Sequence, residues 1–177
     1  MDRMHPFVLQ LTGASASERD QNWLLDDAFF EALDQERILG GEVGVSLHIT
    51  GSEENRAYEL HFVIVGEVTV VCDRCLDPMT QPIQADEVLK VRLADTYADD
   101  GECITVPEIP GSIDVAWNIY EMVALAVPTA HAHPEGQCNP EMTARLAALQ
   151  PTEAAADERW EALRGLNTAP DSDEPHD

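Results

Sequence analysis

The chain has 177 residues, of which 44% are hydrophobic, and this is enough to bury one core. Ten basic against 34 acidic residues give a formal net charge of −24, which argues against a broad surface for nucleic acid phosphates or anionic membranes. No apolar run approaches the ~20 residues that span a bilayer, and no signal-peptide pattern is present. We therefore expect a cytoplasmic protein whose thiols stay reduced.

The acidity has two interpretations. A basic partner, such as a ribosomal protein, would be attracted to such a surface. A host with a salty cytoplasm would select acidic, lysine-poor surfaces in all of its proteins, and Lys90 is the only lysine of this chain. Both interpretations concern the surface of the protein, and neither predicts its fold.

Hydrophobic residues at every second position predict strands in the first half of the chain. A short run covers residues 7–11, and residues 26–33 (DDAFFEAL) predict a turn of helix. The alternation returns over residues 43–49 and again over 58–72, so these two runs predict an antiparallel hairpin. Gly66 interrupts the second run, where we expect a bulge that bends the strand.

The phase of the second run places Cys72 on the buried side of the predicted strand. The residues that follow it, 73–78 (DRCLDP), have the aspartate and proline of a chain reversal. A third alternating run at 89–93 and a short strand at 103–106 come next, with an acidic loop between them.

One helix is predicted in the second half of the chain. Ser112 is placed to cap it, Asp114 lies in its first turn, and Pro128 marks its end. Apolar residues at spacings of three and four predict a stripe that packs on the sheet. These residues are Val115, Ile119, Met122, Val123 and Ala126.

Together these elements predict an α+β fold, mainly an antiparallel β-sheet or a partly open barrel with one main packed helix. We expect a β-rich domain over residues 1–145 and a short helical extension over 146–166, with an amphipathic piece at 157–166. Residues 167–177 (NTAPDSDEPHD) are expected to be a disordered acidic tail.

Two groups of cysteine and histidine predict a metal site. Cys72 and Cys75 form a CxxC pair, and His133 and Cys138 lie in a loop with proline and glycine after the predicted helix. A structural zinc site takes four such ligands in a tetrahedron, and short loops can turn them inward. The sequence therefore predicts a zinc site that joins two distant segments.

Other assignments stay open at this point. Cys103 or His131 is an alternative ligand, and the cysteines are equally compatible with reduced thiols that pack without a metal. A redox pair is the other hypothesis, because Arg74 would lower the pKa of a neighbouring thiol. Thioredoxin-like pairs open a helix, whereas the residues after Cys75 predict a turn into another strand.

No enzyme motif competes with the metal site. The chain has no phosphate-binding loop, no GxSxG and no dinucleotide fingerprint. Its adjacent carboxylates fit solvated loops. We therefore expect a protein that is not an enzyme and has no small-molecule substrate.

Three segments resemble the YceD family, which is described as large ribosomal RNA subunit accumulation proteins. They are residues 66–83 (GEVTVVCDRCLDPMTQPI), 113–128 (IDVAWNIYEMVALAVP) and 133–138 (HPEGQC). The likeness also includes the paired phenylalanines at 29–30 and the DERWEAL stretch at 157–163, and it covers most of residues 7–166 in order.

The resemblance implies a non-enzymatic factor in large-subunit ribosome biogenesis that is needed for 23S rRNA to accumulate. It implies a ribosomal protein or a pre-ribosomal particle as partner. Cys72, Arg74, Cys75, Leu76 and Cys138 occupy positions of the family motif, and His133 has a similar placement, with Arg74 as a binding residue. The charge of −24 departs from what direct rRNA contact would require.

Overall fold

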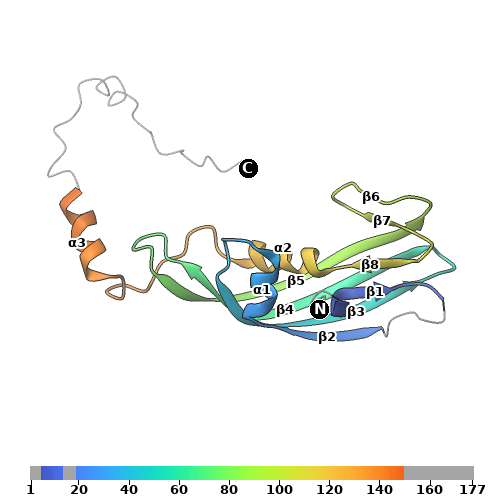
Figure 1. The fold of residues 1–177 in the computed structure, drawn as a ribbon, viewed down its shortest axis with the longest axis horizontal. Coiled ribbons are helices and arrows are strands. Elements are labelled where there is room, and N and C mark those ends of the chain that lie inside the picture. Colours follow the sequence, from blue (N-terminus) through green and yellow to red (C-terminus); the bar gives the residue numbers. More distant parts are fainter. Residues whose placement is uncertain (1–4, 14–18, 150–177) are drawn as a thin grey trace, which may run out of the picture. The chain divides into compact units, whose positions relative to one another are not determined.

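A computed structural model of the chain describes residues 5–13 and 19–149 (Figure 1). The chain divides into two compact units, Met1–Asn139 and Pro140–Asp177. The second unit contains one described helix, α3 (Pro140–Leu149), whose last residues overlap the start of the helical extension predicted at 146–166. The predicted amphipathic piece at 157–166 and the predicted disordered tail at 167–177 lie outside the described residues.

The described residues of the first unit form a six-stranded sheet, a two-stranded sheet and two α-helices. The helices are α1 (Asp27–Leu33) and α2 (Ala116–Ala126), preceded by a 3-10 turn at His5–Phe7. The strands are β1 (Val8–Gln10), β2 (Asp20–Leu25), β3 (Gly40–Ser52), β4 (Ala57–Val71), β5 (Pro78–Ala94), β6 (Ala98–Asp99), β7 (Ile104–Pro107) and β8 (Ser112–Asp114).

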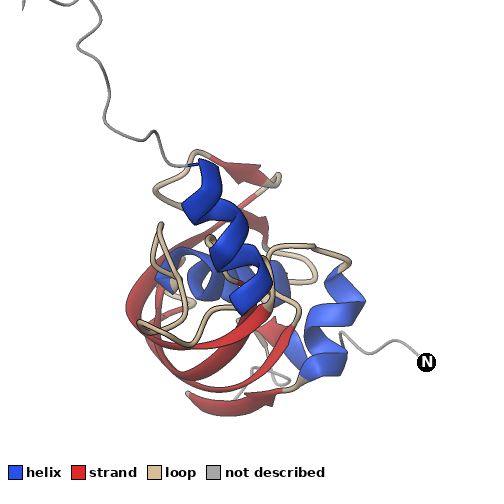
Figure 2. Cartoon of the chain, turned by 90° about the vertical axis from the view of Figure 1, so that its left-hand side faces the viewer, coloured by secondary structure: helices blue, strands red, loops and turns tan. Residues whose placement is uncertain are grey.

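The large sheet has the strand order β2-β3-β4-β5-β7-β6, and β1 pairs with β8 in the small sheet. Among the described pairs only β5 and β7 run parallel; the others are antiparallel. Figure 2 shows how strongly the long strands curve. The α+β prediction is confirmed, and the sheet remains open because β2 and β6 end the strand order.

The core lies between the inner face of the large sheet and the elements that cover it. Alternate residues of β4 point into the core, and Leu60, Phe62 and Ile64 have no exposed surface. Ile119 and Val123 of α2 belong to the same buried cluster, so the predicted helix stripe does pack on the sheet. Within the described residues, no helix is long and apolar enough to cross a membrane.

The hairpin prediction is confirmed, but the bulge predicted at Gly66 is wrong. Strand β4 pairs residue by residue with β3 and β5 through this position, where Gly66 faces Val43 and Ile83. A Cβ atom at Gly66 would lie 2.4 Å from the carbonyl oxygen of Glu42. The glycine is therefore required by the close approach of two backbones, not by an extra residue in the ladder.

The predicted start of the main helix is also wrong. Ser112 belongs to β8, and α2 begins at Ala116, where the carboxylate of Asp114 accepts a hydrogen bond from the Ala116 N–H at 3.0 Å. Pairing with β1 holds Ser112 in an extended conformation. The strands β2 and β8 were not expected, because three to six residues are too few for a clear period and both depend on a partner strand.

Candidate metal centre

The CxxC pair lies in the tight turn that joins β4 to β5. The Cys72 N–H donates to the carbonyl of Asp77 at 2.9 Å, and the Leu76 N–H donates to the carbonyl of Cys72 at 2.9 Å. Leu76 closes the turn with a φ of 65°, in the left-handed region. The backbone N–H of Arg74 reaches the Sγ atom of Cys72 at 3.4 Å. The turn thus directs both cysteines inward, with Cys72 fully buried and Cys75 2% exposed.

The second group of ligands lies on the segment after α2. The helix ends at Ala126, Val127 follows it in an extended conformation, and Pro128 prevents its continuation. Within the following segment the N–H of Gln137 donates to the carbonyl of Pro134 at 3.0 Å. This turn brings Cys138 back toward His133, so that one short loop supplies two donors.

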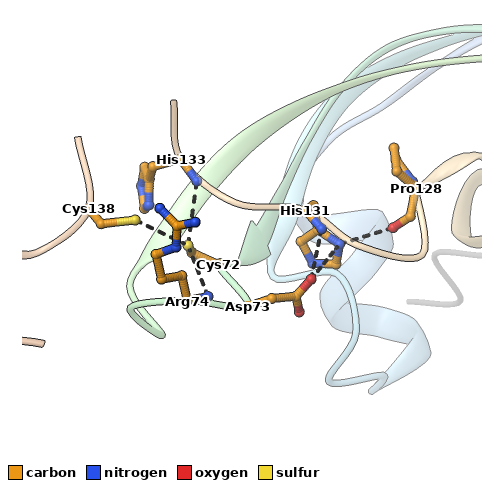
Figure 3. A network of polar contacts seen from close by, with 7 residues as sticks. All are labelled: Cys72, Asp73, Arg74, Pro128, His131, His133 and Cys138. Carbon is orange, nitrogen blue, oxygen red and sulfur yellow. Dashed lines mark hydrogen bonds and ion pairs between the residues drawn. The ribbon is translucent and has the colours of Figure 1, made fainter. Parts of the chain in front are cut away.

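Direct hydrogen bonds hold the two segments together (Figure 3). The Asp73 N–H donates to the carbonyl of His131 at 2.9 Å, and the His131 N–H donates to the carboxylate of Asp73 at 2.7 Å. The side-chain amide of Asn139 donates to the carboxylate of Asp77 at 3.1 Å. The two aspartates of the turn therefore fasten the loop at both ends of the cysteine cluster.

Four donor atoms converge between these segments. The ligand atoms of Cys72, Cys75, His133 and Cys138 all lie within 4.8 Å of one another. The Sγ atoms of Cys72 and Cys138 are 4.0 Å apart, and Nδ1 of His133 lies 3.3 Å from Sγ of Cys75. Ligands of a tetrahedral site with bonds of ~2.3 Å to sulfur stand about 3.8 Å apart. The cluster therefore has the dimensions of a four-coordinate metal site.

The electrostatic surroundings favour a thiolate at Cys72. Burial alone would raise the pKa of this thiol, but the N–H groups of Cys75, His133 and Arg74 donate to its sulfur and lower the pKa to about 5. Burial raises the pKa of the Cys138 thiol, and the neighbouring sulfur atoms of Cys72 and Cys75 raise it further. The two sulfur atoms are close enough to share one hydrogen bond.

The alternative ligands lie elsewhere. His131 is not a member of the cluster, and its Nδ1 instead lies 3.0 Å from the carbonyl oxygen of Pro128. Cys103 precedes β7, and its N–H donates to the carboxylate of Asp100 at 2.8 Å, far along the sheet from the turn after β4. Of the five predicted site residues, Arg74 is exposed and contributes its backbone to the cluster.

The sequence pattern missed Asp73 and Asp77. Both are ordinary turn residues in the sequence, and their role depends on contacts with His131 and Asn139, which lie 58 and 62 positions further along the chain. An aspartate inside a CxxC motif with a histidine near the second ligand group was the available signal. It becomes informative only once the two segments are known to meet.

Three thiols and one imidazole suit a metal ion that prefers sulfur and nitrogen donors. All four positions are filled by protein side chains, which is typical of a structural site, because a catalytic site leaves one position for water or substrate. In chemical terms this cluster can join the β4–β5 turn to the segment after α2.

Comparison with models of protein families identifies the family of the chain. Residues 60–167, more than half of the chain, match the model described as large ribosomal RNA subunit accumulation protein YceD. The matched region contains all four residues of the cluster. Comparisons with curated proteins and with solved structures gave no match. With the family motif folded into this cluster, the chain belongs to the YceD family.

Proposed function

We propose that the protein is a non-enzymatic factor that supports accumulation of 23S rRNA during assembly of the large ribosomal subunit. Membership of the YceD family is the observation that carries this proposal, since the family is described by large ribosomal RNA subunit accumulation. A role without catalysis agrees with a cluster in which every donor position is taken by a side chain.

Zinc is the metal that best fits the cluster in this proposal. Three cysteines and one histidine form a common donor set of structural zinc sites. A bound zinc ion would neutralise part of the charge on the three sulfur atoms and join the two segments. Asp73, His131 and the Asp77–Asn139 pair would position these segments around it.

The thiol redox alternative has less support. Reactive cysteines are partly exposed, whereas Cys72 and Cys75 are 0% and 2% exposed. The CxxC pair lies in a turn between two antiparallel strands instead of at the start of a helix. The low pKa of Cys72 serves metal binding equally well, because the ligand form of cysteine is the thiolate.

Protein contacts are the mode of action that we propose. The net charge of −24 repels rRNA and attracts basic proteins, a group that includes most ribosomal proteins. The protein would hold a basic large-subunit protein, alone or in a pre-ribosomal particle, until rRNA competes for it. This proposal explains how a cytoplasmic acidic protein acts on rRNA levels without touching rRNA.

Depletion in the host tests the function. We expect the ratio of 23S to 16S rRNA to fall and to recover when the wild-type chain is supplied again. Pull-down at the internal salt concentration of the host is expected to recover a large-subunit protein or a pre-ribosomal particle. An unchanged rRNA ratio together with a pull-down free of ribosomal components would contradict the proposal.

The affinity for zinc is expected to fall as the pH is lowered, because protons compete with the metal for sulfur. Above about pH 6 the Cys72 thiol, with its pKa near 5, gives up no proton on binding. The Cys138 thiol, whose pKa is raised, must release one. Affinity should therefore drop by at least about tenfold per pH unit near neutrality and more steeply below pH 5.

Competition with a chromogenic chelator between about pH 5 and 8 measures this dependence. Cys103→Ser is the matched control, because Cys103 is outside the cluster and its loss should leave the slope unchanged. A zinc affinity that does not vary with pH would show that the thiols are not the ligands.

A further inference from the structure

The outer face of the large sheet carries a group of exposed apolar side chains. Leu24 is 67% exposed, Val65 is 54% exposed, and Val63 and Val88 are each 45% exposed. We call these four residues the outer patch. A solvent-facing side of an antiparallel sheet normally carries polar residues, so a group of large apolar side chains there points to a binding surface.

Strand register shows that the members of the outer patch are neighbours. Leu24 of β2 pairs with Gly44 of β3, which pairs with Val65 of β4. Val63 is the next outward residue of β4, and Val88 lies diagonally from it on β5. Because Gly44 has no side chain, the surface between Leu24 and Val65 is open down to the backbone of β3.

Carboxylates border the outer patch. Glu42 and Glu67 are cross-strand partners at one end, next to Gly44 and Val65 along their strands. Asp86 is the cross-strand partner of Val63. In the described part of the chain, none of these three acids forms an ion pair. Like charges directly opposite each other destabilise a sheet, and a cation between Glu42 and Glu67 would relieve the repulsion.

The negative charge of the chain and of the carboxylates around the outer patch limits which kind of molecule can bind there. A second copy of the chain would bring another net charge of −24 and a second unpaired Glu42–Glu67 pair to the interface. Nucleic acid and anionic membranes are repelled for the same reason. A segment with both apolar and basic side chains can pack on the apolar residues of the patch and pair with the carboxylates that border it.

We propose that the outer patch is the docking surface for a basic segment of a partner protein. Its apolar side chains pack on Leu24, Val63 and Val65, with one entering the space above Gly44. A lysine or arginine lies between Glu42 and Glu67. The inference rests on the proposed function for the source of the partner, a basic protein of the large subunit, and locates its contact away from the metal centre.

The surface is tested with two synthetic peptides of equal positive charge. One alternates lysine and arginine with leucine and valine, and the other has serine in place of the apolar residues. The full chain is expected to bind the first about tenfold more tightly than the second, in low salt and in 1 M KCl, because apolar burial is not screened. Equal affinities would overturn the inference, since charge alone would then account for binding.

Two variants locate the binding site. The triple variant Leu24→Gln, Val63→Thr and Val65→Thr keeps the charge and the shape of exposed strands and is expected to lose the preference for the apolar peptide. Glu42→Gln with Glu67→Gln should weaken binding about tenfold in low salt. The matched control, Glu36→Gln with Glu54→Gln, removes the same charge from two exposed positions that belong neither to the outer patch nor to its bordering carboxylates, and it should change the affinity by less than about twofold.

A carbodiimide cross-link between carboxylates of the chain and lysines of purified large-subunit proteins separates this inference from the proposed function. Cross-links concentrated on Glu42, Glu67 and Asp86 support both. If no ribosomal protein is captured but the peptide result depends on the outer patch, the surface stands and its proposed source of partners fails. A triple variant that melts normally and binds the apolar peptide as tightly as the wild type overturns the inference.

Discussion

Replacement of Cys75 by serine is expected to remove the metal and lower the melting temperature by roughly 8 to 16 °C. Protein purified without chelator should carry about one zinc per wild-type chain and almost none per Cys75→Ser chain. A ligand present at about a thousand times its dissociation constant stabilises the folded state by ~4 kcal/mol, and ~1 kcal/mol shifts the midpoint by about 2 to 4 °C in a chain of this size. The large hydrophobic core on the inner face of the sheet should nevertheless keep the variant folded.

Metal analysis and thermal melting with and without chelator check this result. Chelator should bring the wild type to the melting temperature of Cys75→Ser and leave the variant itself unchanged. Cys103→Ser removes a half-buried cysteine outside the cluster, so it should keep both its zinc and its response to chelator. Metal-free wild-type protein with chelator-independent melting would mean that the thiols simply pack there.

Replacement of Gly66 by alanine is expected to destabilise the protein by at least about 3 kcal/mol, the upper part of the range for overpacked sites. The added Cβ would lie 2.4 Å from the carbonyl oxygen of Glu42 and 2.6 Å from the Cα of Val43. Both contacts are with backbone, so relief requires that β3 and β4 move apart at the centre of the sheet. No side-chain rotation can absorb the overlap.

Gly44→Ala is the matched control for this substitution. Gly44 lies on β3 in the same sheet, and a Cβ there would meet only the Val65 carbonyl oxygen at an ordinary 3.5 Å. The free energy of unfolding of the Gly44→Ala variant should stay within about 1 kcal/mol of wild type. The added methyl group has room, and alanine also reduces the conformational entropy of the unfolded chain. Urea denaturation of both variants measures the difference. Equal stabilities would show that the strands are not in close contact at Gly66.

The effects of replacing Cys75 and Gly66 are linked through strand β4 and the turn that follows it. Gly66 allows β4 to run unbroken across β3, and the same strand ends at Val71, next to Cys72. The unbroken phase is what buries Cys72 on the side of Val68 and Val70. A bulge at Gly66 would have reversed that phase and directed the thiol to solvent.

Most of the sheet can be predicted from the residue pattern alone, because burial of one face imposes a period of two on residues 43–49 and 58–72. The apolar stripe of α2 and the four candidate ligands can be predicted in the same way, since they depend on local spacing and on residue chemistry. The short strands β2 and β8 and the start of α2 needed a pairing partner, and no local pattern contains that partner.

Which of the donors come together depends on contacts between segments that are far apart in the sequence. The sequence favours His133 and Cys138 but leaves His131 and Cys103 as alternatives. In the folded chain Asp73 binds the His131 N–H, the His131 ring lies against the carbonyl of Pro128, and the His133 ring lies against Cys75. The outer patch could not be predicted from the sequence either, because Leu24 and Val65 become neighbours only through the register of three strands. Alternation shows that a residue faces out; cross-strand pairing decides what lies beside it.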